Sequence, residues 1–350
     1  MSALGIGVVS FAHGHVNAYC NRMKQWDDVR LVAAWDDDAE RGQAQSDTFQ
    51  MSYSPHLEDL LSRRDVDAVI VTSETNRHAE HCIAAAEAGK HILLQKPMAL
   101  TLDDCDRIIA AVEKSGVTLQ MAFQMRCDPV NIQMKQMIDD GVLGKVGTLR
   151  RRHCIGVLFN PGFFQGKTRW HVDAVANKGM FMDDAVHAAD FMYWMLGKPT
   201  TVMAEIGNVL TDVAPDDTGM AIYRFPDGAF GLLYNCSATV AAEITTEIYG
   251  DRAALHHYYG DGVSTQYAPE NAAPLKLMRR GQSQFDEIRI PLPRAHGERI
   301  AAVPRPWIDM LKRGDAPVCD HRAGRISTSM CLAAYESAES GRRVEIDYGQ

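Results

Sequence analysis

The chain has 350 residues, of which 46% are hydrophobic and 23% charged, and its formal net charge is −9. This length exceeds the usual size of one hydrophobic core, so two domains are expected. The negative charge argues against a nucleic-acid partner, which needs a basic face, and no apolar run predicts a membrane span. The apolar N-terminus lacks the basic start and cleavage site of a signal peptide. The eight cysteines form no C-x-x-C pair, which indicates buried thiols in a reducing compartment, so a cytoplasmic protein is expected.

Residues 3–122 alternate short apolar runs with amphipathic segments, which is typical of a parallel sheet covered by helices on both faces. The strands are expected, in chain order, at residues 3–9, 29–35, 68–72, 91–94 and 118–122. Helices are expected between the strands at residues 16–25, 56–62, 78–88 and 102–114. Thr101 is a suitable N-cap for the last of these helices, and Gly116 is a suitable end.

From about residue 125 the sequence favours strands, after one helix expected at residues 129–140. Residues 217–238 indicate a hairpin around Pro226-Asp227-Gly228. The other elements expected here are strands at residues 146–158, 201–209 and 244–249 and a final helix at residues 322–340. The pattern predicts an α/β protein with a doubly wound parallel sheet in residues 1–124. Residues 125–350 would form an α+β domain with a large, mainly antiparallel open sheet, and the final helix is a candidate to pack back on the first domain.

The loop after the first strand is the expected place for a dinucleotide pyrophosphate. It departs from the G-x-G-x-x-G pattern, because Ser10 and Ala12 stand where glycines are usual. Small side chains at these two positions still permit a tight turn close to the phosphates. A plain strand-to-helix turn is an equally good interpretation of this segment alone. The cofactor contacts expected in the loop are Ser10, Phe11, Ala12, His13 and His15.

A second group of cofactor contacts is expected where the next strands end. Asp36 ends the second strand, where an acid accepts hydrogen bonds from the adenosine ribose. Asp37 and Asp38 follow, and three acids would repel a 2′-phosphate, so NAD is expected rather than NADP; the alternative is a solvated acidic turn. His78 opens a helix and is either a cofactor contact or a packing residue. The polar residues that follow the strand at 68–72, and that are expected at the cofactor, include Thr72, Ser73 and Asn76.

Three further side chains are suited to proton transfer. Lys96 follows the apolar strand at residues 91–94, at the edge of the sheet where ligands bind. Asp183 and His187 are four positions apart in a helical segment, so both are expected on one helix face. Such groups can move a proton while a cofactor takes a hydride. The sequence leaves open whether Lys96 or His187 is the base, and a solvated lysine and a structural Asp-His pair are the alternatives.

In their order along the chain, these residues resemble the Gfo/Idh/MocA family of glucose–fructose oxidoreductases and inositol dehydrogenases. The motifs that carry the resemblance run nearly end to end: Asn76-x-His78, Ala88-Gly89-Lys90-His91, Lys96-Pro97, Arg126-x-x-Pro129, Gly141-x-x-Gly144-Lys145-Val146 and Gly179-x-x-x-Asp183-x-x-x-His187-x-x-Asp190. The resemblance implies an NAD(P)-binding Rossmann domain and a C-terminal domain whose open sheet often mediates oligomerisation. It also implies catalytic roles for Lys96, Asp183 and His187, and a peptide bond before Pro97 that is often cis.

The chain departs from the family pattern in places. Gln95 replaces a glutamate, and Met180-Phe181 stands where relatives carry glycines. We place Gln95, Lys96 and Gln124 with the cofactor contacts.

Substrate contacts are expected from the aromatic segment at residues 159–178, because aromatic rings suit the C–H faces of a sugar. Packing on a neighbouring subunit is the alternative for this segment, and an interdomain ion pair is the alternative for Arg126. No histidine or cysteine spacing supports a metal site, so none is expected. The expected substrate contacts are Lys96, Arg126, Trp170, His171, Asp183 and His187.

The predicted function is an NAD-dependent oxidoreductase that transfers a hydride between nicotinamide and a hydroxyl carbon of a sugar, cyclitol or glycoside. Two alternatives stay open: glycoside cleavage by transient oxidation and elimination, and a non-catalytic NAD-binding regulator. The expected partners are a small-molecule substrate and further copies of the chain, in a dimer or tetramer formed through the C-terminal sheet.

Overall fold

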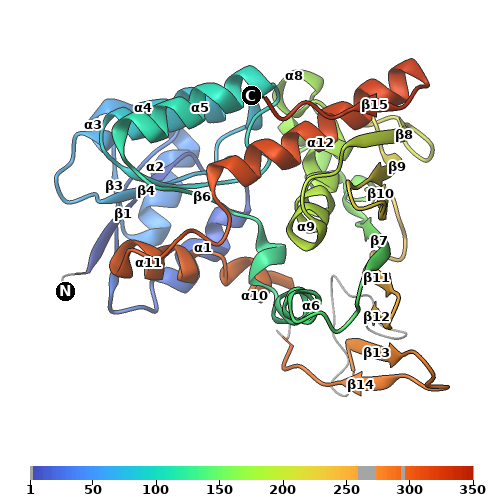
Figure 1. Ribbon diagram of the computed structural model, residues 1–350. Coiled ribbons are helices and arrows are strands. Elements are labelled where there is room, and N and C mark those ends of the chain that lie inside the picture. The colour runs from blue at the N-terminus through green and yellow to red at the C-terminus, as the bar shows by residue number, and fades with distance from the viewer. Residues whose placement is uncertain (1–2, 259–272, 293–295, 350) are drawn as a thin grey trace. The chain divides into compact units, whose positions relative to one another are not determined.

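The computed structural model describes residues 3–258, 273–292 and 296–349 (Figure 1). The chain divides into two compact units. The first comprises Met1–Gln124 and Gly297–Arg325, and the second comprises Met125–His296 and Ile326–Gln350. That these units are a cofactor domain and a substrate domain stays a prediction.

The first unit contains a six-stranded sheet in which every paired strand is parallel. The strands, in the order β3-β2-β1-β4-β5-β6, are Ser52–Tyr53, Val29–Trp35, Leu4–Val9, Ala68–Val71, His91–Leu94 and Leu119–Met121. The order reverses between β1 and β4, so the loops that leave these two strands border the crevice in which open α/β sheets bind ligands. The predicted doubly wound sheet is confirmed.

Helices connect the parallel strands of the first unit. They are α1 (His15–Met23), α2 (Ala39–Phe49), α3 (Leu57–Leu61), α4 (His78–Glu87) and α5 (Leu102–Ser115), with a 3-10 turn, η1, at Thr75–Arg77. The expected cap of α5 is confirmed, because the Thr101 side chain accepts a hydrogen bond from the Asp104 amide and Gly116 is left-handed with a φ of 68°. Helix α2 was not expected, because its sequence is polar and only weakly amphipathic.

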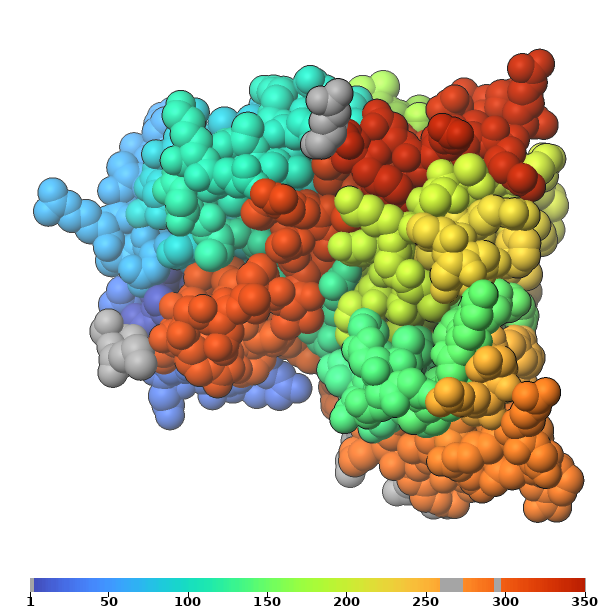
Figure 2. Space-filling model, viewed as in Figure 1, coloured from blue at the N-terminus to red at the C-terminus, as the bar shows by residue number. Residues whose placement is uncertain are grey.

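A late segment of the chain completes the first unit. It contains α10 (His296–Ala301), α11 (Pro304–Arg313) and the start of α12 (His321–Ser340). Helix α11 lies beside α1 in Figure 1, and in Figure 2 the orange-red atoms of this segment pack against blue and teal atoms of the first 124 residues. Arg305 of α11 lies over the Trp26 ring at 4.5 Å and donates to Asp28 at 3.0 Å. Arg325 at the start of α12 donates to Asp106 of α5 at 2.5 Å. These contacts tie the returning segment to the parallel-sheet unit.

The described residues of the second unit form a nine-stranded, mostly antiparallel sheet, and among these strands only β7 and β10 pair in parallel. The strands are β7 (Val146–Cys154), β8 (Thr201–Gly207), β9 (Thr218–Arg224), β10 (Phe230–Cys236), β11 (Ile244–Gly250), β12 (Ala253–His257), β13 (Leu275–Arg279), β14 (Asp286–Ile288) and β15 (Val344–Glu345). The predicted open sheet is confirmed, as is the hairpin of β9 and β10, which turns at Gly228 with a φ of 93°. The strand expected at 146–158 ends earlier, because a 3-10 turn, η3, begins at Val157.

Short helices lie between the strands of the second unit, and α9 packs on β7 and β10 (Figure 1). They are α6 (Pro129–Asp139), η3 (Val157–Phe159), α7 (Pro161–Phe164), η4 (Arg169–Val172), α8 (Ala174–Asn177), a π-helical turn at Phe181–Ala185 and α9 (Val186–Leu196). A further 3-10 turn, η2 (Gln124–Cys127), joins the two units along the chain. No helix among the described residues has the length and apolar character that a membrane crossing requires.

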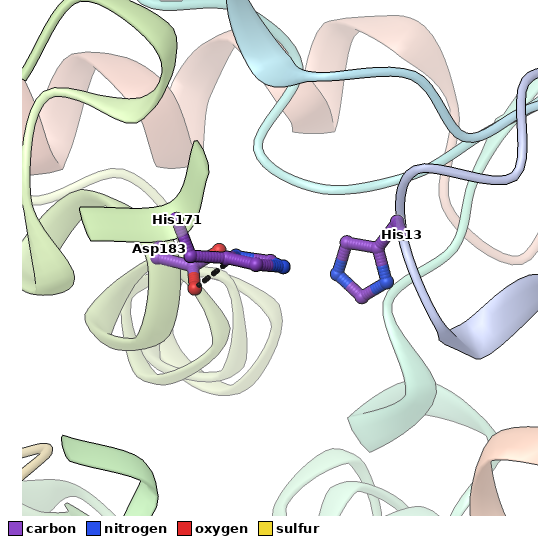
Figure 3. Close-up of side chains that lie close together, drawn as sticks. All are labelled: His13, His171 and Asp183. Atoms are coloured by element: carbon purple, nitrogen blue, oxygen red, sulfur yellow. Dashed lines mark hydrogen bonds and ion pairs between the residues drawn. The ribbon is translucent and has the colours of Figure 1, made fainter. Parts of the chain in front are cut away.

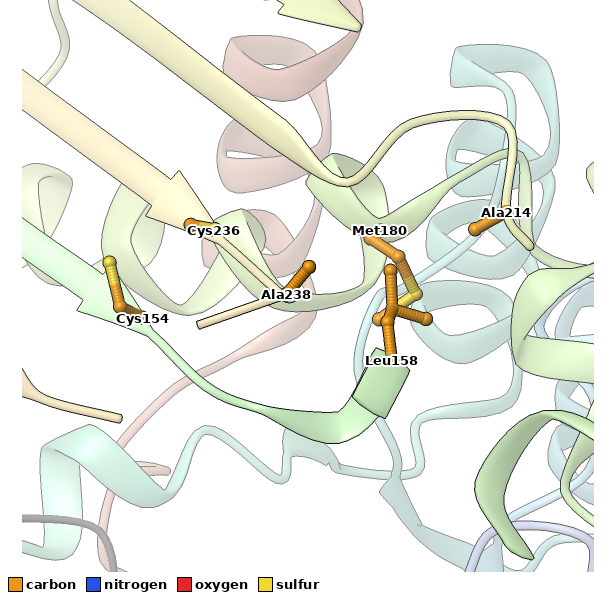
Figure 4. Close-up of a cluster of buried hydrophobic side chains, with 6 residues drawn as sticks. All are labelled: Cys154, Leu158, Met180, Ala214, Cys236 and Ala238. Atoms are coloured by element: carbon orange, nitrogen blue, oxygen red, sulfur yellow. The ribbon is translucent and has the colours of Figure 1, made fainter. Parts of the chain in front are cut away.

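A small apolar cluster lies at the ends of β7 and β10 (Figure 4). It includes Met180, which directly precedes the π-helical turn. Its buried members are Cys154, Leu158, Met180, Ala214, Cys236 and Ala238. Cys154 and Cys236 face each other in register, and burial raises the pKa of the Cys154 thiol. Seven of the eight cysteines are buried and none of the eight forms a disulfide, as expected of thiols that serve as packing residues.

Candidate functional site

The loop after β1 takes the shape that a glycine usually provides. Ser10 is left-handed with a φ of 68°, and its hydroxyl accepts a hydrogen bond from the Ala12 amide at 3.2 Å. The left-handed region costs a non-glycine residue about 1–2 kcal/mol, which this local hydrogen bond offsets in part. The Thr72 hydroxyl donates to the Ser10 carbonyl at 2.5 Å, and the His13 amide donates to the Thr72 carbonyl at 2.9 Å. The loop is therefore fixed to the end of β4, and its small side chains and tight turn fit a dinucleotide pyrophosphate.

The Asp36 carboxylate holds this loop in place. Its side chain is 0% exposed and accepts a hydrogen bond from the Phe11 amide at 2.6 Å. Arg41 of α2 donates two more, from Nε at 2.9 Å and from Nη2 at 2.6 Å. The Asp38 amide supplies a fourth at 2.9 Å. The carboxylate that sequence places at the ribose is thus occupied by protein donors, and its contact with a cofactor stays a prediction.

Gln95 joins the end of β5 to the same loop. Its Nε2 lies 2.8 Å from His15 Nδ1 and 3.1 Å from both ring nitrogens of His13, and its Oε1 accepts from the Tyr19 hydroxyl at 3.4 Å. The amide that replaces the family's glutamate is 1% exposed. The sequence alone gave no sign of its bond with Tyr19, which lies on α1.

His78 ties together two segments that follow neighbouring strands. Its Nδ1 lies 2.9 Å from the Pro97 carbonyl oxygen and its Nε2 lies 3.1 Å from the Ser73 carbonyl oxygen. Burial lowers the pKa of His78 to about 4, although two carbonyl oxygens beside the ring favour the charged form. The ring is 1% exposed, which favours the packing role over direct contact with a cofactor. Asn76, two residues earlier, is exposed.

Lys96 directly follows β5 and is 3% exposed. The peptide bond between Lys96 and Pro97 is cis, as the family resemblance implied. Gln124 is also buried, at the start of the 3-10 turn η2. A buried lysine at the carboxyl edge of a parallel sheet fits a chemical role better than a solvated one.

In the second unit, Asp183 lies in the π-helical turn and pairs with His171. The distance from His171 Nδ1 to Asp183 Oδ2 is 3.0 Å (Figure 3). The imidazole stacks on Trp170 at 3.7 Å and on Phe163 at 4.9 Å between ring centroids. We call His171 and Asp183 the dyad. Its carboxylate fixes one ring nitrogen and leaves the other directed away from Asp183 (Figure 3).

His187, which sequence spacing put on the same helix face as Asp183, has a different neighbour. Its ring stacks on His153 of β7, with centroids 5.5 Å apart and planes 16° from parallel. That Asp183 and His187 lie on one helix face stays a prediction. The contact of His187 with His153 depends on the packing of α9 on β7, which the sequence pattern did not reveal.

Remote side chains cap the start of the π-helical turn. The Phe181 amide donates to Asp216 Oδ1 at 2.7 Å, and the Met182 amide donates to the Tyr335 hydroxyl oxygen at 3.2 Å. That hydroxyl donates to Asp216 Oδ2 at 2.7 Å. Burial raises the pKa of Asp216. A Cβ added at Gly179 would lie 1.9 Å from the Asp216 carboxylate, so glycine is needed there.

Arg126 forms a buried ion pair inside the second unit. Its Nε and Nη2 donate to Asp190 at 3.0 Å and 2.8 Å, and its guanidinium lies over the rings of Tyr193 and Trp194. Sequence considered an interdomain pair as the alternative to a substrate contact, and the structure shows a pair within one unit. Its contact with substrate stays a prediction.

Comparison with protein families identifies the class of protein that this fold and these residues define. Residues 3–123 match the oxidoreductase family model with an NAD-binding Rossmann fold. Residues 131–256 match the model of the GFO/IDH/MocA C-terminal domain. The chain is therefore an oxidoreductase with an NAD-binding domain, and the prediction of NAD as cofactor is confirmed. It belongs to the Gfo/Idh/MocA family, as its motifs implied.

Individual relatives share this architecture nearly end to end. The chain is 25% identical to myo-inositol 2-dehydrogenase of Thermotoga maritima, over 99% of this chain and 98% of that one. It is 27% identical to 1,5-anhydro-D-fructose reductase of Ensifer adhaerens, over 91% of this chain and 92% of that one. Among solved structures, levoglucosan dehydrogenase in complex with NADH and L-sorbose has a TM-score of 0.85 at 20% identity, covering 99% of this chain and 100% of that one. This last likeness supports the fold.

Proposed function

We propose that this protein uses NAD to oxidise or reduce a hydroxyl carbon of a sugar, cyclitol or glycoside. Bound NAD supplies the acceptor or donor of the hydride. The observation that carries the proposal is the dyad, in which an imidazole is oriented by Asp183 and stacked on Trp170. Aromatic rings suit the C–H faces of a sugar, and an oriented imidazole suits its hydroxyl groups. The named activities of the inositol, anhydrofructose and levoglucosan enzymes also support this substrate class.

The chain's own residues supply proton transfer. We assign this role to Lys96, Asp183 and His187, with Lys96 and His187 as the two candidates for the base. Lys96 is 3% exposed and directly follows β5, at the carboxyl edge of the sheet where ligands bind. Asp183 holds His171 in one orientation, which fits a substrate ligand whose second ring nitrogen meets a hydroxyl.

A substrate panel with two matched variants tests the proposal. Sugars, cyclitols and glycosides are screened with NAD and NADP while the absorbance of the reduced nicotinamide is followed. Lys96→Met should lower kcat by about 10²–10⁴-fold, the usual size of an acid–base contribution. Lys114→Met, which alters an exposed lysine at the end of α5, should leave kcat unchanged.

Other outcomes of the same screen contradict the proposal. Product release from a glycoside without net NADH indicates cleavage by transient oxidation and elimination. Absence of turnover with every compound, together with NAD binding that Lys96→Met leaves intact, indicates a non-catalytic regulator.

We also propose that copies of the chain assemble into a dimer or tetramer through the open face of the nine-stranded sheet, in the cytoplasm. Met203, Met220 and Ile222 alternate with buried residues on β8 and β9 and are 45%, 51% and 50% exposed, and Phe230 on β10 is 40% exposed. A contiguous apolar patch of this kind is typical of protein–protein interfaces. Ile222→Lys should lower the mass measured by light scattering from an oligomer to a monomer, whereas Val209→Lys, in the loop after β8, should not. A wild-type protein that is monomeric at micromolar concentration contradicts this proposal.

A further inference from the structure

A strained turn separates the two segments of the second unit that carry the dyad. Lys178 has a φ of 66° and a ψ of −54°, and the Gly179 amide donates to the Asn177 carbonyl oxygen at 2.8 Å. These angles and this bond define a γ-turn of the rare, strained kind. Glycine adopts such a conformation at little steric cost, so a lysine at this position points to a role for its side chain.

The γ-turn is bonded to the backbone of both members of the dyad. On one side, Asn177 Nδ2 donates to the His171 carbonyl oxygen at 3.1 Å. On the other side, the Gly179 carbonyl oxygen accepts a hydrogen bond from the Asp183 amide at 3.1 Å. A change in the path of the chain at Lys178 would therefore move His171 and Asp183 relative to each other.

The Lys178 side chain reaches the two residues that cap the π-helical turn, Asp216 and Tyr335. Lys178 Nζ lies over the Tyr335 ring, 4.9 Å from its centroid, and all three side chains line one pocket of about 320 Å³. A cation in this position is attracted to the face of the ring. The ammonium therefore holds the ring whose hydroxyl bonds to Asp216 and to the Met182 amide of the π-helical turn.

The charge of Lys178 also acts on Asp216. This carboxylate accepts from the Phe181 amide and from the Tyr335 hydroxyl, and a proton on the second oxygen would turn that acceptor into a donor. Burial raises the pKa of Asp216, whereas its two hydrogen bonds and the Lys178 ammonium oppose this rise. Among the titratable groups around Asp216, Lys178 supplies the positive charge; the others are Asp217, Cys331, Tyr335 and Glu339.

We propose that Lys178 is a positioning residue whose ammonium holds Tyr335 and Asp216 against the π-helical turn and so fixes His171 and Asp183 relative to each other. This role accounts for a lysine in a backbone conformation that glycine adopts more easily. Lys178 acts through the γ-turn and the two capping residues and does not contact the substrate. Its effect on turnover rests on the proposed function of the dyad.

Three substitutions at Lys178 test this role by kcat, by the pH dependence of kcat and by melting temperature. Lys178→Met removes the charge and keeps a long side chain. It should lower kcat by about threefold or more and leave NAD binding unchanged, since one cation–π contact shifts an equilibrium by about two- to thirtyfold. The acidic limb of the kcat profile should move to higher pH, because Asp216 loses a charge that favours its ionised form. Lys178→Arg retains the cation and should restore most of the activity.

Lys178→Gly separates positioning from folding. Relief of the backbone strain should raise its melting temperature by about 2–4 °C above that of Lys178→Met. Its kcat should nevertheless stay as low as that of Lys178→Met, because the ammonium is absent. Recovery of kcat together with stability in this variant would make Lys178 a purely structural residue and overturn the proposal.

Lys198→Met is the matched control. Lys198 also places its Nζ over a tyrosine ring, that of Tyr348 at 5.1 Å, but it is exposed and lies after the end of α9. Its replacement should leave kcat within about twofold of wild type and the pH profile unchanged. An effect equal to that of Lys178→Met would show no special role for Lys178 and contradict the proposal.

The ring resonances of His171, measured by NMR and assigned with His171→Gln, report on the dyad without turnover. They should shift in Lys178→Met and stay in place in Lys198→Met. If the wild type turns over none of the sugars, cyclitols and glycosides, the proposed function is wrong, and these resonances still decide the role of Lys178. Unchanged resonances in Lys178→Met overturn the positioning role whether or not the protein is active.

Discussion

In the first unit, the residues expected at the cofactor are held by groups at the ends of parallel strands and on the helices that directly follow them, whereas in the second unit the dyad depends on side chains from distant segments. Ser10 and Thr72 bond to each other across adjacent strands, a geometry that the sheet itself dictates. Asp183 lies in a turn whose start is capped by Asp216 and Tyr335, which are 33 and 152 positions further along the chain than Asp183. Changes that leave the fold intact should therefore disturb the dyad more easily than the loop after β1, because that loop is bonded directly to the end of a neighbouring strand.

The largest expected effect comes from removing the Asp36 carboxylate, which holds the loop after β1 in the first unit. Asp36→Ala leaves the Arg41 guanidinium buried without its main partner, and breaking one side of a buried ion pair costs about 3–5 kcal/mol. We expect a loss of that size in the free energy of unfolding, measured with urea and circular dichroism. Asp47→Ala, on the exposed face of the same helix, should cost less than about 0.5 kcal/mol. Similar losses in both variants would mean that the buried Asp36–Arg41 ion pair contributes no more to the free energy of unfolding than an exposed carboxylate does.

Asp36 also shows which features of the first unit could be predicted from the sequence and which could not. Five strands of the parallel sheet were predicted to within one or two residues, because buried strands are continuous apolar runs, whereas the two-residue strand β3 was not expected. The polar helix α2 was missed, and with it the ion pair of Arg41 with Asp36, so Asp36 was expected at the adenosine ribose, with a solvated acidic turn as the alternative. Local pattern predicted where Asp36 lies, but its partner depended on an element without a hydrophobic signal.

Less of the second unit could be predicted from the sequence. The hairpin of β9 and β10 was clear from its turn, but β13 to β15 are short strands and were not expected. The chemical residues Asp183, His187 and His171 were all identified, yet their pairing was not. His171 lies twelve residues before Asp183 in a separate turn, so helical spacing could not predict that these two side chains meet.

A second prediction uses pH to probe the first unit. The pKa of His78 is lowered by burial from 6.5 to about 4 in the folded protein. Above pH 6.5 the ring is neutral in both states and its full contribution is present. As pH falls from 6.5 toward 4, the unfolded chain gains a proton that the folded protein does not, so stability decreases, by up to about 2.5 kcal/mol at pH 4.5.

The measurement compares the free energy of unfolding between pH 7 and 4.5 in three proteins. His78→Gln should be less stable at every pH but should lose less on acidification than the wild type. His56→Gln, at an exposed position before α3, should follow the wild-type slope. If the wild type instead becomes more stable toward pH 4.5 relative to His78→Gln, the carbonyls of Ser73 and Pro97 favour the charged ring more than burial opposes it.

The smallest expected effect on stability sharpens the second half of the comparison. Tyr335→Phe removes the hydroxyl that bonds to the Met182 amide and to Asp216, at a cost of about 1–3 kcal/mol. Tyr335 is a positioning residue, since it acts on the dyad only through the π-helical turn. A small displacement of that turn should lower kcat on the order of tenfold or more and leave NAD binding unchanged, because misplacement of a reacting group is costly even when the fold survives.

Two companions separate positioning from plain destabilisation. Tyr249→Phe removes an exposed hydroxyl from β11 and should leave both stability and kcat near wild type. Asp216→Asn keeps an oxygen that can accept from the Phe181 amide, so it should retain more activity than Asp216→Ala at similar stability. If kcat follows only the folded fraction in all of these variants, the remote cap stabilises the second unit without orienting Asp183. The orientation of the dyad would then not depend on the side chains of Asp216 and Tyr335.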